Sequence, residues 1–223
     1  MVVTIDGPSG AGKGTVSRLL SRRLGWHLLD SGALYRLTAL AGERDGLMPL
    51  DRAGHSRLAE RLNIQFTSHG DGSECVLLDG VDVSTQLRSE AAGAGASRVA
   101  TWAEVRAALL DRQRAFAQPP GLVADGRDMG TVVFPQAPLK IYLVATAEER
   151  AKRRYNQLKG KDSGVSLAAL SREIEARDRQ DSTRLVSPLV PAKDAVVIDS
   201  TRLDAAEVAL QIWRLGLSRG LWH

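Results

Sequence analysis

The sequence predicts an α/β protein in which a five-stranded parallel sheet carries helices on both faces. Two observations predict it. Short apolar runs without polar alternation are separated by segments of helical periodicity, which is typical of buried parallel strands joined by helices. One stretch breaks this alternation with hairpin signals and indicates a small antiparallel insertion.

Five apolar runs, each ending in polar residues, are expected to form the parallel strands: Val2–Ile5, Trp26–Leu29, Leu122–Ala124, Leu139–Val144 and Ala195–Ile198. Helical periodicity follows most of them. The first helix is expected to bury Val16, Leu19, Leu20 and Leu24 on one face and to stop at Gly25. The last is expected to bury Val208, Ile212 and Leu215.

The insertion is expected to contain three short strands, Ile64–Ser68, Cys75–Leu78 and Val81–Val83. The turn sequences His69–Gly72 and Asp79-Gly80 join them. We expect the insertion to occupy about residues 38–98. The core domain then comprises 1–37 and 99–223, with a helical lid at about 148–165.

Composition excludes several classes of protein. The chain has 223 residues, 43% of them hydrophobic, and a formal net charge of +4, which does not suit a disordered protein. Cys75 is the single cysteine, so a disulfide scaffold is excluded. No apolar run approaches the ~20 residues of a membrane span, and the first strand turns polar at Asp6, unlike a signal peptide. We expect a cytoplasmic monomer that binds neither membrane nor nucleic acid.

The positive charge is concentrated in one segment. Arginine accounts for 24 of the 30 basic residues, and its planar guanidinium suits bidentate binding of phosphate. Between residues 148 and 161 six cations face two acidic residues, a local charge of +4 that equals that of the whole chain. The cations are Arg150, Lys152, Arg153, Arg154, Lys159 and Lys161. A general nucleic-acid surface is therefore not required.

The chemistry is carried by the glycine-rich segment Gly7–Thr15, which lies between the first expected strand and the first expected helix. Its members are Gly7, Pro8, Ser9, Gly10, Ala11, Gly12, Lys13, Gly14 and Thr15. Glycines allow backbone N–H groups to surround an anion, the helix N-terminus adds partial positive charge, and Lys13 reaches the outer phosphates. This pattern predicts a P-loop NTPase fold that binds a nucleoside triphosphate.

One position departs from the usual pattern, because Gly14 stands where a Ser or Thr normally binds Mg²⁺. The resulting G-K-G-T sequence resembles that of nucleoside monophosphate kinases. We therefore expect no direct protein ligand to the metal, and Asp125 is the candidate to orient Mg²⁺ through water.

Further polar clusters are expected at the same edge of the sheet, because ligands of open α/β sheets bind beyond the carboxyl ends of the strands. Ser31 and Arg36 follow the second strand; Asp125, Arg127 and Asp128 follow the third. Arg177, Asp181 and Arg184 share one helix face, continuing an apolar stripe of Leu167, Leu170 and Ile174.

Together with the P-loop, four segments resemble the bacterial cytidylate kinase family from Val3 to about Leu203. They are Leu28–Arg36, Ala124–Pro135, Arg177–Arg184 and Pro188–Ala192. The resemblance implies transfer of the γ-phosphoryl group of ATP, bound with Mg²⁺, to CMP or dCMP.

The family's site residues fall on matching positions of this chain. The resemblance implies that Arg36, Arg127 and Arg184 bind the acceptor phosphate, that Ser31, Ser97, Arg106 and Asp128 surround cytosine, and that Arg177 and Asp181 bind the ribose. It also implies that Lys13, Arg127, Arg184, Arg150 and Arg154 stabilise the migrating phosphoryl group, with Arg153 beside them in the lid.

Other interpretations remain open at this point. Arg177 and Asp181 could form a solvated helix pair, Asp30-Ser31 a helix cap, and Arg127–Asp128 a structural ion pair. The acceptor could instead be UMP, dTMP, shikimate or dephospho-coenzyme A. A nucleotide switch would need a base-recognition segment that the sequence lacks, and an RNA-binding protein would need aromatic-rich strands.

Overall fold

The computed structural model describes residues 1–68, 74–158 and 166–223. The expected turn His69–Gly72 lies outside the described residues, as do Lys159 and Lys161 of the expected lid. By its internal contacts the chain divides into two compact units, one formed by Met1–Asp30 with Arg114–His223 and the other by Ser31–Gln113. The smaller unit thus extends beyond the expected insertion at both ends.

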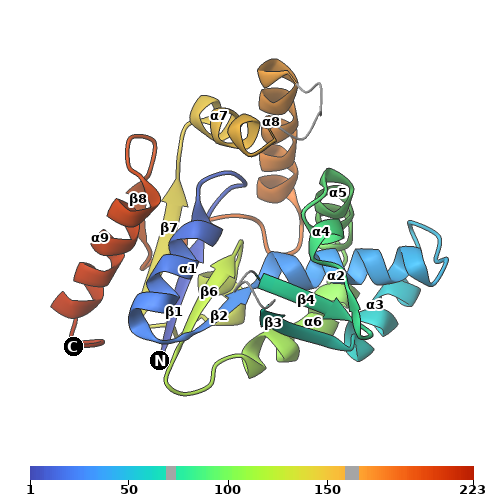
Figure 1. Cartoon of the computed structure of the whole chain (residues 1–223), viewed down its shortest axis with the longest axis horizontal. Coiled ribbons are helices and arrows are strands. Elements are labelled where there is room, and N and C mark those ends of the chain that lie inside the picture. The colour runs from blue at the N-terminus through green and yellow to red at the C-terminus, as the bar shows by residue number, and fades with distance from the viewer. Residues whose placement is uncertain (69–73, 159–165) are drawn as a thin grey trace. The chain divides into compact units, whose positions relative to one another are not determined.

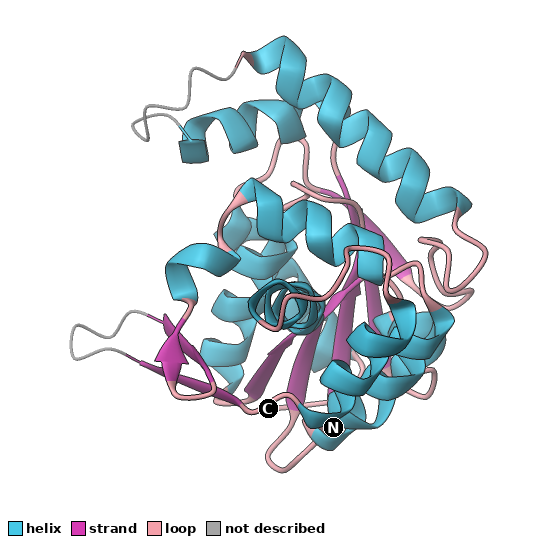
Figure 2. Ribbon diagram, turned by 90° about the vertical axis from the view of Figure 1, so that its right-hand side faces the viewer, coloured by secondary structure: helices cyan, strands magenta, loops and turns pink. Residues whose placement is uncertain are grey.

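In the described part of the larger unit, five parallel strands form one sheet in the order β2-β6-β1-β7-β8 (Figure 1). Their bounds are β1 Val2–Asp6, β2 His27–Asp30, β6 Leu122–Gly126, β7 Leu139–Val144 and β8 Val196–Asp199. Each strand overlaps one of the five predicted runs, so the predicted parallel sheet is confirmed. The sheet twists from strand to strand (Figure 2).

Four α-helices and one π-helix belong to the described part of the larger unit. They are α1 (Lys13–Leu24), α7 (Ala147–Leu158), α8 (Leu167–Thr183), α9 (Ala205–Ser218) and the π-helix η1 (Met129–Val133). In the apolar core, Val3 and Ile5 of β1 pack with side chains of α1 and α9. Because side chains alternate along a strand, Thr4 and Asp6 point to the opposite face.

The predicted apolar face of α1 is correct except at one position. Val16 and Leu20 are fully buried in the core, whereas Leu19 is 37% exposed. Positions 16, 20 and 24 follow one another every four residues, and Leu19 lies at the margin of this stripe. In α8, Leu170 and Ile174 are buried as predicted, whereas Leu167 is exposed as the first residue of the helix.

The smaller unit combines helices with a small sheet. The described strands of this unit pair antiparallel in the order β3-β4-β5, which confirms the predicted hairpins. The bounds are β3 Ile64–Ser68, β4 Glu74–Leu78 and β5 Val81–Asp82, with α2 Ser31–Arg44, α3 Arg52–Arg61, α4 Ser84–Leu87, α5 Glu90–Val99 and α6 Ala103–Ala115. The helix α2 packs against α5, and a Cβ atom on Gly95 would come within 2.8 Å of Ala39. Within the described residues, no helix has both the length and the apolar composition of a membrane span.

The adjacent leucines Leu19 and Leu20 of α1 provide a test of the core. Leu20→Ala should lower the free energy of unfolding by about 2–5 kcal/mol, because it removes a fully buried side chain and leaves a cavity. Leu19→Ala, in the same helix, should lower it by less than about 1 kcal/mol. Urea denaturation of both variants measures the difference, and equal losses would contradict the assigned face.

Candidate active site

The loop between β1 and α1 has the backbone of a phosphate-binding loop. Gly7, Gly10 and Gly12 all have positive φ angles. A Cβ atom on Gly7 would collide with the carbonyl oxygen of Leu143 in β7, so this position requires glycine. No side chain caps the first turn of α1, and that turn contains no acidic residue. Its N–H groups and partial positive charge are therefore suited to an anionic ligand.

Lys13 is buried at the start of α1, where its Nζ donates to the carbonyl oxygen of Pro8 at 2.9 Å. The pKa of Lys13 is lowered to about 7, first by burial and then by the charge of Arg127, while the carboxylates of Asp125 and Asp6 act in the opposite direction. A polyphosphate bound at the loop would raise this pKa again, because it places negative charge beside the ammonium group.

Arg150 of α7 binds the backbone of the P-loop and a carboxylate of α8. Its guanidinium donates to the carbonyl oxygen of Ser9 at 3.0 Å, and it forms a bidentate pair with Asp178 of α8 at 2.5 and 2.9 Å. The Arg150 side chain is 6% exposed. These bonds hold it against protein atoms, and its expected contact with the migrating phosphoryl group stays a prediction. Arg154, one turn further on, donates to Gln157.

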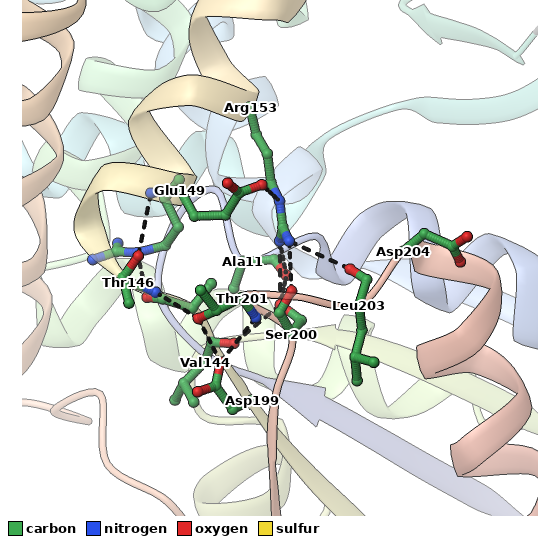
Figure 3. Close-up of polar contacts among 12 residues, drawn as sticks. Ala11, Val144, Thr146, Glu149, Arg153, Asp199, Ser200, Thr201, Leu203 and Asp204 are labelled. Carbon is green, nitrogen blue, oxygen red and sulfur yellow. Dashed lines mark hydrogen bonds and ion pairs between the residues drawn. The ribbon is translucent and has the colours of Figure 1, made fainter.

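A second arginine of α7 binds the same loop, together with a serine that follows β8 (Figure 3). Arg153 donates to the carbonyl oxygen of Ala11 at 3.3 Å and to that of Ser200 at 2.6 Å. The Ser200 hydroxyl is within hydrogen-bond distance of the carbonyl oxygens of Ala11 and Val144, 3.0 Å from each. Glu149 holds the Arg153 guanidinium from the other side at 3.0 Å.

The outward carbonyl groups of the P-loop thus have partners on α7 and after β8. Alternate peptide groups of a nest direct N–H groups to the anion and carbonyl groups away from it. The carbonyls of Ser9 and Ala11 accept from Arg150, Arg153 and Ser200. The loop is therefore held in shape before any ligand arrives, which reduces the entropy lost on binding.

In the larger unit, Asp181 also bridges two arginines. Arg127 Nε donates to its carboxylate at 2.9 Å, and Arg184 Nη1 lies 3.9 Å from the other oxygen. Although burial acts to lower it, the pKa of Arg127 is raised, since Asp181 stabilises the charged guanidinium. Arg184 ends α8 as its C-cap residue, so the loop after the helix sets its position. The side chains of Arg184 and Asp181 are both almost fully buried.

Arg177 and Asp128 lie in the same electrostatic environment. The charge of Arg177 lowers the pKa of Lys13, and that of Asp128 raises the pKa of Asp6. Asp128 is buried and precedes η1, but its side chain makes no capping hydrogen bond to that helix. Of the predicted residues of the larger unit, Arg127, Asp125 and Arg177 thus lie close enough to Lys13 to shift its pKa.

Asp125 fits the metal expected with a bound nucleotide. A Cβ atom on Gly14 would lie 3.3 Å from Asp125 Oδ2, so the carboxylate occupies the space beside the position where other P-loops carry a hydroxyl. A carboxylate next to nucleotide phosphates suits Mg²⁺, which keeps several waters and takes few protein ligands. Among residues 1–68, 74–158 and 166–223, no cluster of three or more His, Cys, Asp or Glu side chains could hold a metal by itself.

The other predicted binding residues belong to the smaller unit. Ser31 is buried at the first turn of α2, Arg36 follows on the same helix, and Ser97 lies on α5. Arg106 of α6 is buried, donates to the carbonyl oxygen of Ala100 at 3.2 Å, and lies 5.5 Å from the ring centroid of Tyr35. The predicted site residues thus form two sets, one in each unit.

Three structural contributors had no assigned role in the sequence analysis. They are Asp6, Asp178 and Ser200, which bind backbone or guanidinium groups around the P-loop. Asp6 and Ser200 each lie at the polar end of an apolar strand, which is the one signal that distinguishes them in the sequence.

Comparison with known proteins decides the family. The model of the family described as cytidylate kinase matches residues 3–216. The curated cytidylate kinase of Pseudomonas fluorescens (strain Pf0-1) is 57% identical over 212 residues, which cover 95% of this chain and 93% of that protein. The chain belongs to the cytidylate kinase family.

Other cytidylate kinase relatives agree with this assignment. The cytidylate kinase of Stutzerimonas stutzeri (strain A1501) is 56% identical with the same coverage of both chains. Among solved structures, a shikimate kinase from Bacteroides thetaiotaomicron aligns with 99% of this chain and 98% of its own, with 14% identity and a TM-score of 0.47.

The low pKa of Lys13 predicts that nucleotide binding takes up protons. At pH 8 Lys13 is largely neutral in the free protein, and the bound triphosphate raises its pKa, so up to about one proton is absorbed. Isothermal titration calorimetry with ATP in buffers of different ionisation enthalpy measures this uptake. Lys13→Met should reduce it markedly. Equal proton uptake by wild type and variant would contradict the assignment.

Proposed function

We propose that this member of the cytidylate kinase family transfers the γ-phosphoryl group of ATP to the 5′-phosphate of CMP and dCMP. The observation that carries the proposal is the placement of a P-loop, Lys13 and the Arg127–Asp181–Arg184 group in one unit of the chain. Such an arrangement supplies one anion site for a donor and one for an acceptor. Family membership selects cytidine nucleotides as the acceptors.

ATP binds through its phosphates to the P-loop, residues Gly7–Thr15. Backbone N–H groups surround the β-phosphate. Lys13 stabilises the negative charge of the phosphoryl group as it passes from donor to acceptor. Because Lys13 is buried, its attraction to phosphate is weakened less by water than that of a surface lysine. Mg²⁺ supplies charge neutralisation at the phosphates when ATP is bound, and Asp125 would hold it through water.

The acceptor phosphate is assigned to Arg127 and Arg184, with Arg36 from the smaller unit. Two guanidinium groups held by one carboxylate present their remaining N–H groups in a fixed geometry, which favours a doubly charged phosphate. Arg177 and Asp181 are assigned to the ribose. A carboxylate can accept a hydrogen bond from the exocyclic amine of cytosine, and we assign this role to Asp128 with Ser31, Ser97 and Arg106.

The reaction requires positioning and charge neutralisation more than covalent participation. An oxygen of the acceptor phosphate attacks the γ-phosphorus in line, and ADP leaves with the bonding electrons. Lys13 and the arginines stabilise the charge on the transferred group. Arg150 and Arg154 of the lid are assigned to the same task, which for Arg150 requires exchange of its present partners.

We also propose that the reaction takes place in the cytoplasm, where ATP is available, and that the enzyme acts as a monomer. Light scattering during turnover tests the monomeric state.

A panel of acceptors tests the function directly. With ATP and Mg²⁺, ADP release should be fastest with CMP and dCMP. It should be at least about tenfold slower with UMP, dTMP, shikimate and dephospho-coenzyme A, because these lack the cytosine amine that donates a hydrogen bond to Asp128. A coupled ADP assay gives kcat/KM for each acceptor. If another acceptor exceeds both cytidine nucleotides, the proposal is wrong.

Asp128 is the residue that tests cytosine recognition. Asp128→Ala should reduce the ratio of kcat/KM for CMP to that for UMP by about tenfold or more, since one charge-assisted hydrogen bond is lost. The KM for ATP should remain within about twofold, because ATP is assigned to the P-loop and not to this side chain. A variant that kept its CMP preference and lost ATP binding would contradict the assignment.

A further inference from the structure

Asp6, the last residue of β1, holds a loop that is more than 120 residues distant in sequence. Its Oδ1 accepts the backbone N–H of Met129 at 2.8 Å, and its Oδ2 accepts that of Gly130 at 2.8 Å. These are the first two residues of η1. Each oxygen of this buried carboxylate thus binds one of two consecutive peptide groups. The two hydrogen bonds together fix the position and orientation of this segment relative to β1.

The same segment is held by shape as well as by hydrogen bonds. Gly130 lies so close to β1 that a Cβ atom would come within 2.9 Å of Thr4 Oγ1 and 3.2 Å of Lys140 Cδ. Thr4 and Asp6 point to the same face of β1 because they are two residues apart. Among the described residues, Thr4 Oγ1 has no hydrogen-bond partner, so its main effect here is steric.

The contact of Asp6 with Met129 and Gly130, here called the clamp, joins the start of the P-loop to the segment that follows Arg127 and Asp128 in the sequence. Asp6 directly precedes Gly7, the first glycine of the P-loop. The clamped residues directly follow Arg127 and Asp128. A displacement of the Met129–Gly130 peptide groups would therefore move both side chains relative to the P-loop.

Burial of the Asp6 carboxylate is unfavourable for the free energy of folding. The pKa of Asp6 is raised to about 7, mainly by burial and also by the charge of Asp128, although the two N–H groups and Lys13 act to lower it. Tyr142 on the neighbouring strand β7 also lies within its field. An apolar side chain would avoid this desolvation, but it would leave the buried N–H groups of Met129 and Gly130 without an acceptor, so the carboxylate is tied to the position of these two peptide groups.

We propose that Asp6 is a positioning residue that sets Arg127 and Asp128 at their working distance from the P-loop by binding the N–H groups of Met129 and Gly130. The proposal rests on the function assigned above, because those two side chains are assigned to the acceptor. Asp6 itself touches neither substrate in this account. Its effect appears in acceptor recognition and not in ATP binding.

The first test is Asp6→Asn. The amide has one acceptor oxygen, so one of the two N–H groups faces an NH₂ group instead. Hydrogen exchange at Met129 and Gly130, followed by NMR, should accelerate about tenfold or more. The KM for CMP should rise and the CMP-to-UMP preference should fall by a similar factor, while the KM for ATP stays within about twofold. Removing a buried charge also removes its desolvation cost, so the variant is expected to fold.

A second, independent variant displaces the loop and keeps the carboxylate. Gly130→Ala should produce the same kinetic signature, because its methyl group collides with Thr4 Oγ1. Adding Thr4→Ala removes that atom and should restore most of the loss, whereas Thr4→Ala alone should leave kinetics unchanged. Ile212→Val, a core change in α9, is the control for a general loss of stability.

The results distinguish an error in the assigned function from an error in the positioning role of Asp6. If wild type fails to phosphorylate CMP, the assigned function is wrong, while the exchange rates at Met129 and Gly130 still report on the clamp. If Asp6→Asn exchanges as slowly as wild type, or raises the KM for ATP as much as that for CMP, the positioning role is wrong. The same conclusion follows if Ile212→Val reproduces the selective loss, or if Thr4→Ala fails to rescue Gly130→Ala.

Discussion

The structure depends on concentrating positive charge in a buried place. Lys13 is buried, and the charge of the partly exposed Arg127 lies close enough to lower the pKa of Lys13. Such a cluster is stable only if carboxylates are interposed and the remaining donors are bonded. Asp181 between Arg127 and Arg184, and Asp178 against Arg150, meet this requirement.

The same contacts prepare the site for its substrates. A lysine whose pKa is lowered by burial and by neighbouring cations gains more from a phosphate than a fully charged surface lysine does. The arginines and Ser200 behind the P-loop fix its carbonyl groups, so its N–H groups are already directed to one side. In this sense the interactions that hold the empty protein together also arrange its groups for phosphoryl transfer.

Local patterns predicted the fold well, because they rest on features that repeat along the chain. The five apolar runs, the hairpin turns and the P-loop were visible in the sequence. Leu19 was placed wrongly because it lies at the margin of its helical stripe. The compact unit Ser31–Gln113 is longer than the predicted insertion 38–98, since α2 packs on α5, which no local pattern reveals.

Long-range polar contacts could not be predicted in the same way. The partners of Asp6 are over 120 residues away and are backbone N–H groups, which leave no trace in residue type. The resemblance implies that Arg150 stabilises the migrating phosphoryl group, and this role stays a prediction. The sequence does not show that Asp178 and the carbonyl group of Ser9 bind the Arg150 guanidinium in this structure.

A crystal structure with CMP and a non-hydrolysable ATP analogue tests the central claim most directly. The account predicts triphosphate oxygens within hydrogen-bond distance of the N–H groups of the P-loop and of Lys13 Nζ, with the phosphate of CMP bound by Arg127 and Arg184. Phosphates bound away from these groups, or an unchanged Lys13–Pro8 hydrogen bond with the triphosphate elsewhere, would contradict it.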